Sequence, residues 1–223
     1  MAGNLALFDL DNTLLLGDSD YSWGEFLVAQ GLVDGPRYHA RNQAFYQDYQ
    51  AGRLNMEEYF AFSQQPLMDH GLQALSELRP VFMDTVIKPM IAPGAKDLLE
   101  RHAGDYRIII TATSQFITQP IAEHLGVDLL IATDPEFVDG RATGRIAGTP
   151  CYQDGKITKL TQWLASDGRQ FDRTWFYSDS INDLPLLEWA DHPTVVHPDA
   201  RPQAEAEARG RPVMNLESPV DEA

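Results

Sequence analysis

A short apolar run that stops at two acids constrains this chain more than any other stretch. Residues 5–8 are Leu-Ala-Leu-Phe, and Asp9 and Asp11 come directly after them. Several apolar residues in a row suit a parallel strand that is buried on both faces. The acids then fall at the carboxyl end of the strand, where open α/β sheets bind ligands. Because an unpaired buried carboxylate is very costly, we expect the two acids either to cap local structure or to hold a cation.

The second half of the chain alternates between strand-like and helix-like segments. Strands are predicted at 107–110, 129–132, 174–177, 194–197 and 213–216, and helices at 95–103, 117–125, 158–165, 184–189 and 202–209. Pro120 should be tolerated only near the start of its helix. Residues 137–147 are typical of a hairpin turned at Asp139-Gly140. Strands that alternate with helices predict an α/β fold with a parallel sheet.

Residues 18–88 differ from the rest of the chain. They show helical periodicity with many aromatic residues and no strand signal, and Asn55 has the position of a helix N-cap. We therefore predict a helical insertion. The predicted division is a catalytic core of residues 1–16 and 89–223, with residues 17–88 as a helical cap.

Composition excludes several classes of partner. The chain has 223 residues, of which 17 are basic and 33 acidic, for a formal net charge of −16. This charge would repel nucleic acid. The single cysteine, Cys151, permits no intrachain disulfide and favours a reducing compartment. No signal peptide or membrane-length apolar run is found, so we expect a cytoplasmic protein without membrane contact, as a monomer or homodimer.

Four groups of polar residues fall at predicted strand ends or just before a helix. They are Asp9 with Asp11, Thr111, Lys156, and Asp179 with Asn182 and Asp183. Taken singly, Thr111 could be a strand-end hydroxyl, Lys156 a solvated lysine, and Asn182-Asp183 a helix cap. Together they supply what phosphoryl transfer needs: a nucleophile, a proton shuttle, carboxylates for Mg²⁺, and cationic or hydroxyl groups for the phosphoryl oxygens.

This set resembles the haloacid dehalogenase superfamily, in its phosphatase branch, over residues 5–183. The resemblance implies a Rossmann-like core with a helical cap inserted after the first strand. It also implies that Asp9 is the nucleophile and Asp11 the general acid and base. The four motifs are Asp9-x-Asp11-Asn12-Thr13, Thr111 after an apolar strand, Lys156 before a helix, and Asp179-Ser180-Ile181-Asn182-Asp183.

The resemblance assigns the remaining motif residues to phosphate and metal. Thr111, Lys156 and Asn182 would bind the phosphoryl group. Asp9, the backbone carbonyl of Asp11, and Asp179 would bind Mg²⁺, and Asp183 would support the metal site.

The predicted cap resembles the small cap of phosphoserine-phosphatase-like members, which implies a small phosphomonoester substrate. Those enzymes place a Glu for the substrate amine where this chain has Asp18. They place an Arg for the substrate carboxylate where this chain has Ser63, and a hydroxyl cannot replace a bidentate guanidinium. Arg41 or Arg53 could supply a guanidinium from elsewhere in the cap.

The cap entry, residues 17–23, is acidic and aromatic, and includes Asp18, Asp20 and Trp23. Such a lining favours a cationic or heteroaromatic amine phosphate. Bacterial members with a similar entry act as histidinol-phosphatases, so histidinol phosphate is the leading substrate, with phosphoserine or a broad range of small metabolites as alternatives. A phosphosugar mutase and a non-catalytic binding module are the competing functions.

Overall fold

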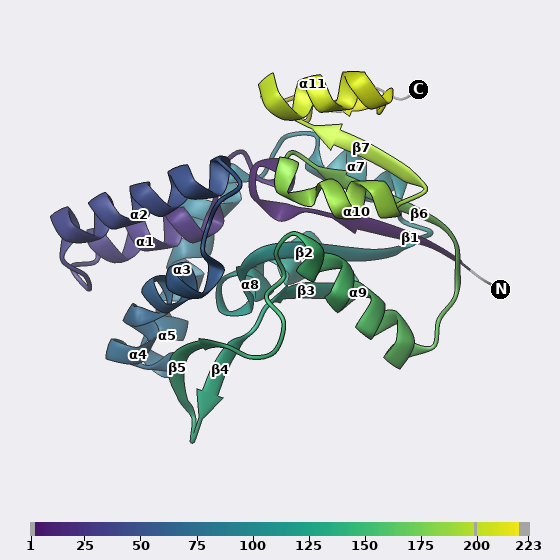
Figure 1. Ribbon diagram of the computed structural model, residues 1–223. Coiled ribbons are helices and arrows are strands. Elements are labelled where there is room, and N and C mark those ends of the chain that lie inside the picture. The colour runs from purple at the N-terminus through teal and green to yellow at the C-terminus, as the bar shows by residue number, and fades with distance from the viewer. Residues whose placement is uncertain (1–2, 199, 219–223) are drawn as a thin grey trace.

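Six parallel strands form one sheet at the centre of the molecule, in the order β3-β2-β1-β6-β7-β8 (Figure 1). The computed structural model describes residues 3–198 and 200–218. Every neighbouring pair in this sheet is parallel, which confirms the predicted sheet. The strands are β1 Gly3–Phe8, β2 Tyr106–Ser114, β3 Leu129–Thr133, β6 Phe171–Ser178, β7 His192–Val196 and β8 Val213–Met214.

Helices cover both faces of the sheet. Leu5 and Leu7 of β1 belong to the apolar cluster under α9 and α10, whereas Ala6 and Phe8 belong to the cluster under α7 and α8. This alternation explains why residues 5–8 are apolar at every position. The core helices are α7 Ala95–Arg101, α8 Gln115–Leu125, α9 Asp154–Asp167, α10 Leu184–Trp189 and α11 Ala200–Arg209, with a 3-10 turn at Ile181–Asp183.

The residues between β1 and β2 are helical, as predicted, and most of them gather at one side of the sheet (Figure 1). Asn55 caps α3, because its Oδ1 accepts the backbone N–H groups of Glu57 and Glu58 at 3.2 and 3.3 Å. The elements are the turn Leu10–Leu14, α1 Ser19–Ala29, α2 Gly35–Gln50, α3 Met56–Ser63, α4 Gln65–His70, α5 Leu72–Phe82, the turn Met83–Ile87, and α6 Lys88–Met90.

The insertion shares its apolar core with the sheet. Trp23 of α1 packs edge-on against Phe82 of α5 and Phe116 of α8, with ring centroids 5.0 and 5.9 Å apart. All three rings belong to the cluster that contains Phe8. Helices α1 and α5 are therefore anchored to the sheet, and we keep 17–88 as the proposed extent of the cap.

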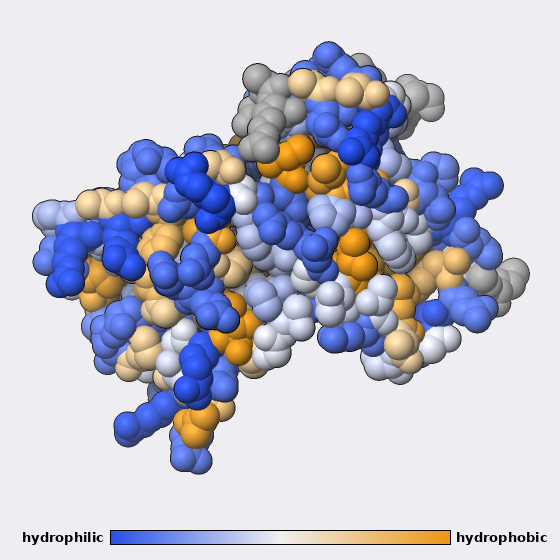
Figure 2. Space-filling view, viewed as in Figure 1, coloured by the Kyte–Doolittle hydropathy of each residue, from blue (hydrophilic) through white to orange (hydrophobic). Residues whose placement is uncertain are grey.

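The predicted hairpin consists of β4 Pro135–Val138 and β5 Arg141–Ile146, turned at Asp139 and Gly140 with φ angles of 51° and 74°. It packs against α3 and α4 and projects below them (Figures 1 and 2). A Cβ atom on Gly144 would lie 2.9 Å from Met68 Cε. The glycine thus permits close contact between β5 and α4, and the hairpin extends the insertion's side of the molecule.

Two local expectations were wrong. Helix α9 begins at Asp154, so Lys156 lies in its first turn rather than before it. Pro120 lies inside α8, where its missing N–H leaves the carbonyl of Phe116 without its helical donor. Arg79 of α5 replaces that donor: its Nη1 lies 3.1 Å from Phe116 O. A contact between distant helices therefore permits a proline that local rules disfavour.

Cys151 is buried, and its Sγ donates to Ile131 O at 3.6 Å. Burial raises the pKa of this thiol to about 12, so it stays protonated and packs as a small residue. Among the described residues, none of the helices combines the length and the apolar character that crossing a bilayer requires.

Candidate active site

A buried lysine connects two acids at the carboxyl edge of the sheet. Lys156 Nζ donates to Asp9 Oδ1 at 2.8 Å and to Asp183 Oδ2 at 2.7 Å. The three residues are only 2–3% exposed. Burial alone would lower the pKa of Lys156, but Asp183 and Asp9 raise it above its ordinary value, so the lysine stays charged. Burial, opposed by Lys156, raises the pKa of Asp9 to about 7.

The turn after β1 contacts the carboxyl end of β6 and positions Asp179 there. The hydroxyl of the fully buried Thr13 accepts the Asp179 N–H at 3.0 Å and donates to Asp179 Oδ1 at 3.2 Å. Ser178 Oγ donates to Asp183 Oδ2 at 2.6 Å. Burial, and then the charge of Asp9, raise the pKa of Asp179. The carboxylates of Asp9 and Asp179 thus lie close enough to repel each other.

Asp11 is held by two donors. Ser19 N–H, at the start of α1, donates to Oδ1 at 2.6 Å, and Thr113 Oγ1 donates to Oδ2 at 2.8 Å. Burial, and then the charge of Asp18, raise the pKa of Asp11 to about 7. The Thr111 hydroxyl oxygen accepts the N–H of Thr113 at 3.2 Å, which leaves its own hydrogen for another acceptor.

The oxygen donors at this edge fit Mg²⁺. The ion takes oxygen ligands, keeps several waters, and usually binds one or two carboxylates. Asp9 and Asp179, with the Asp11 backbone carbonyl that the family resemblance implies, would supply such a set, and a cation would relieve the repulsion between the two carboxylates. Within residues 3–198 and 200–218 no His, Cys, Asp and Glu side chains form a metal-binding cluster of three or more, but this ion does not need one.

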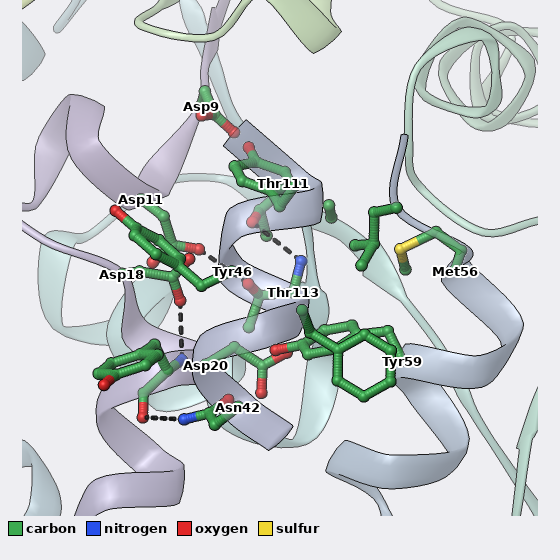
Figure 3. Close-up of a pocket in the computed structure, with 15 residues that line it drawn as sticks. Asp9, Asp11, Asp18, Asp20, Asn42, Tyr46, Met56, Tyr59, Thr111 and Thr113 are labelled. Atoms are coloured by element: carbon green, nitrogen blue, oxygen red, sulfur yellow. Dashed lines mark hydrogen bonds between the residues drawn. The ribbon is translucent and has the colours of Figure 1, made fainter. Parts of the chain in front are cut away.

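One pocket extends from the catalytic edge to the helical insertion (Figure 3). Its volume is about 530 Å³, including space open to solvent. In Figure 3, Asp9 and Thr111 lie at one end, and Asp20, Asn42 and Tyr59 lie at the other. Arg, Lys and His are missing from the lining residues that the structure describes, which are Asp9, Asp11, Asp18, Asp20, Tyr21, Asn42, Phe45, Tyr46, Tyr49, Leu54, Met56, Tyr59, Thr111, Ala112 and Thr113.

Two acids of α1 and its N-cap face this pocket. Asp18 caps α1, since its Oδ1 accepts the Tyr21 N–H at 2.8 Å. Asp20 is 6% exposed, and the nearby Tyr59 hydroxyl acts to lower the pKa of its carboxyl. Burial raises the pKa of each carboxyl to about 7. Neither acid forms a salt bridge within the part of the chain that the structure describes.

Three residues predicted to contact substrate do not line the pocket. Trp23 is 3% exposed inside the shared apolar core. Arg41 lies over the Phe45 ring at 5.1 Å, and Arg53 is an exposed partner of Asp48 at 2.8 Å. Helix phase turns the side chains of Trp23 and Arg41 away from the pocket, whereas Arg53 lies in the loop between α2 and α3.

Asn182 contacts the insertion rather than Asp9. Its Nδ2 donates to Tyr49 O at 3.1 Å, and its Oδ1 accepts from the Tyr152 hydroxyl at 3.2 Å. It lines a separate hollow together with Asp179 and His197. Its amide is therefore engaged in joining α2 to the core.

Sequence reasoning did not single out several lining residues. On α2 they are Asn42, Phe45, Tyr46 and Tyr49, which recur at the spacing of one helix face. Helical spacing alone does not distinguish a face that packs in a core from one that covers a pocket, and only the fold shows that this face covers a polar pocket. Thr113 lies two residues after Thr111, a spacing that places both side chains on one side of β2.

Comparison with known proteins agrees with this geometry. Residues 6–188 match the model of the haloacid dehalogenase-like hydrolase family. A histidinol-phosphatase of Neisseria meningitidis is 43% identical over 96% of this chain and 99% of the relative. A phosphoserine phosphatase of Mycobacterium tuberculosis is 30% identical over 92% of this chain and 68% of the relative.

Solved structures show the same fold. A Bordetella pertussis protein of unknown function has a TM-score of 0.90 at 42% identity, over 97% of this chain and 100% of that one. A phospho-aspartyl intermediate analogue of phosphoserine phosphatase has a TM-score of 0.66 at 18% identity, over 98% and 95%. From the matched residues, the relatives and the parallel-sheet fold together, we conclude that this chain belongs to the haloacid dehalogenase-like hydrolase family and is an enzyme of its phosphatase branch.

Proposed function

We propose that this enzyme hydrolyses histidinol phosphate through an aspartyl-phosphate on Asp9, with Mg²⁺ as its cofactor. One observation carries the choice of substrate. The pocket that begins at Asp9 is lined by acids and aromatic rings and by no guanidinium, within the described residues. It therefore suits a leaving group that carries nitrogen and lacks a carboxylate.

Asp9 is the proposed nucleophile. Its carboxylate oxygen attacks phosphorus while the bond from phosphorus to the leaving oxygen breaks. Asp11 donates its proton to that oxygen and releases the alcohol. Asp11 then removes a proton from water, whose oxygen attacks the phosphorus of the aspartyl-phosphate, so that inorganic phosphate leaves and Asp9 is restored. The pKa of Asp11, raised by burial to about 7, suits a group that acts as acid and then as base near neutral pH.

Lys156 and Thr111 would hold the phosphoryl oxygens, since Lys156 is a buried cation bonded to Asp9 just behind the pocket wall, and Thr111 is a hydroxyl donor that lines the pocket. Asp183 keeps Lys156 in place, and Ser178 keeps Asp183 in place. Asp9, the backbone carbonyl of Asp11, and Asp179 would hold Mg²⁺. When bound, the ion neutralises phosphoryl charge that these acids would otherwise repel. We leave Asn182 out of the phosphate-binding set because its amide bonds Tyr49.

Phosphoserine is the second candidate, favoured by the Mycobacterium tuberculosis relative. Its carboxylate would enter a pocket that already contains Asp18 and Asp20. Ser63, at the position where a guanidinium was expected, is 6% exposed and donates to Phe60 O at 3.3 Å. The pocket therefore provides repulsion where phosphoserine needs a cation.

The deciding experiment compares kcat/KM for histidinol phosphate, phosphoserine and p-nitrophenyl phosphate in the presence of Mg²⁺. We expect histidinol phosphate to be the best of the three. A higher value for phosphoserine would refute the proposed substrate and leave the phosphatase chemistry in place. Loss of turnover on all three, with the protein folded, would instead favour a binding module.

The pocket and the composition also bear on the size of the substrate and on the cellular compartment of the enzyme. The buried, unpaired Cys151 fits a reducing compartment such as the cytoplasm. The pocket admits a small phosphomonoester, and the acidic net charge of −16 disfavours nucleic acid as a substrate.

A further inference from the structure

The far end of the pocket is built from three helices that meet around one carboxylate. Asp20 comes from α1, Asn42 from α2 and Tyr59 from α3, and all three line the pocket opposite Asp9 (Figure 3). Asp20 and Asn42 are 6% and 3% exposed. Such convergence of polar groups from separate elements is typical of a ligand-binding end rather than of a helix-packing interface.

Asp20 has no structural role that explains its burial. Asp18 caps α1, whereas Asp20 lies beside the Tyr59 hydroxyl and pairs with no cation among the described residues. A carboxylate has about four acceptor positions, and a single hydroxyl leaves most of them for a ligand. Asn42 donates its Nδ2 to Tyr21 O at 3.3 Å, so its Oδ1 is a second acceptor at this end.

Aromatic rings and a thioether line the pocket beside these polar groups. Phe45, Tyr21, Tyr46 and Tyr59 contribute rings, and Met56 contributes a thioether. Aromatic faces and buried acceptors together suit a ring that carries N–H donors and a partial or full positive charge. An aliphatic ammonium would use the acceptors and could lie over one ring face, but it lacks the flat surface with which a heterocycle stacks on several rings.

We propose that Asp20, assisted by Tyr59 and Asn42, binds the nitrogen heterocycle of the leaving group and sets the specificity for it. This inference rests on the proposed function. In this arrangement the phosphoryl group lies at Asp9, the aliphatic amine lies near Asp18 in the middle of the pocket, and the ring N–H donates to Asp20 at the far end.

The test compares two substrates that differ at the ring alone. Histidinol phosphate carries imidazole, and phenylalaninol phosphate carries a phenyl group of similar size without N–H donors. We expect the wild type to prefer imidazole in kcat/KM, because a phenyl ring leaves a buried carboxylate unpaired. Asp20→Asn should reduce this preference by about a hundredfold, mainly through KM, and Tyr59→Phe should reduce it by about tenfold.

Asp34→Asn is the matched control, since it removes an exposed acid before α2 that lies outside the pocket. Its preference should equal that of the wild type. An unchanged preference in Asp20→Asn, with the protein folded by circular dichroism, would overturn the inference.

A second readout separates this inference from the proposed function. Histidinol and phenylalaninol are tested as inhibitors of p-nitrophenyl phosphate hydrolysis. If histidinol phosphate is a poor substrate, the proposed function fails. The ring subsite still stands if histidinol inhibits the wild type better than phenylalaninol and Asp20→Asn removes that difference; it falls if the two alcohols inhibit equally.

Discussion

The two ends of the pocket differ in whether their buried acids have a cationic partner. At the phosphoryl end, Lys156 lies between Asp9 and Asp183 with hydrogen bonds of 2.8 and 2.7 Å. Asp18 in the middle of the pocket and Asp20 at the far end have no cationic partner within the described residues, and burial raises the pKa of both to about 7.

This difference separates the chemistry from the specificity. A phosphoryl group is the same in every phosphomonoester, so the lysine that balances the acids there can be part of the fold. The leaving group varies, and an acid without a built-in partner favours a substrate that brings the cation. The absence of a cation beside Asp20, among the described residues, therefore indicates that the ligand itself carries positive charge.

The largest expected effect is at the phosphoryl end. Asp9→Asn removes the proposed nucleophile, and we expect kcat to fall at least about a thousandfold, or about 4 kcal/mol in activation free energy. The measurement is phosphate release by the purified variant with Mg²⁺, with Asp34→Asn as the control. Phosphate release at the wild-type rate would show that another group attacks phosphorus.

Lys156→Met tests whether the lysine balances the negative charge of the buried acids at the phosphoryl end. The change leaves Asp9 and Asp183 buried without their cation, so the free energy of unfolding should fall by about 3–5 kcal/mol. Lys159→Met is the control, because Lys159 pairs with the partly exposed Asp134 and should cost about 1 kcal/mol or less. Urea denaturation measures the free energy of unfolding of both variants. Equal decreases would mean that the buried ion pairs of Lys156 stabilise the protein no more than the surface pair of Lys159.

Mg²⁺ should stabilise the same end. Binding to Asp9 and Asp179 relieves their repulsion, so Mg²⁺ at a hundred times its Kd should raise the free energy of unfolding by about 2.7 kcal/mol. Thermal melts in Mg²⁺ and in a chelator measure the shift. Asp179→Asn should remove most of it, and an undiminished shift in that variant would place the ion elsewhere.

The smallest effect belongs to the far end. Burial raises the pKa of Asp20 in the folded protein from 3.8 to about 7, so between these values the folded state binds a proton that the unfolded state lacks. Stability therefore falls as pH rises through this window. Without Mg²⁺, Asp20→Asn should be about 2 kcal/mol more stable than the wild type at about pH 8, with the difference closing near pH 4.

Asp34→Asn should show no such pH-dependent gain. If Asp20→Asn destabilises the protein at about pH 8, then Asp20 is stabilising as an ion, and the contrast between the two ends of the pocket is wrong.

Much of the catalytic end could be predicted from order and residue type. Asp9 and Asp179 directly follow β1 and β6, and parallel strands bring their carboxyl ends to one edge. Thr111 was expected just after its strand, but β2 continues to Ser114, so Thr111 lies within the second half of β2. The register of β1 places Phe8 level with Ile109 of β2 and Tyr177 of β6, so the convergence follows once the sheet is parallel.

The cap end could not be predicted in the same way, because its geometry depends on helix phase and packing. The sequence selected Asp18 and Asp20 together with Trp23, Arg41 and Arg53, but only the two acids line the pocket. A helix rotated by one residue changes which side chain faces inward.

Local sequence therefore determined the parallel sheet, the helical insertion and the set of polar residues at the strand ends, since apolar periodicity is a local property. Tertiary structure decided which acid finds a partner. Lys156 reaches Asp9 across 147 positions of sequence, whereas Asp20 meets the Tyr59 hydroxyl and no cation within the described residues. Charge balance is set by neighbours in space, and it is this balance that distinguishes the phosphoryl end from the end that selects the substrate.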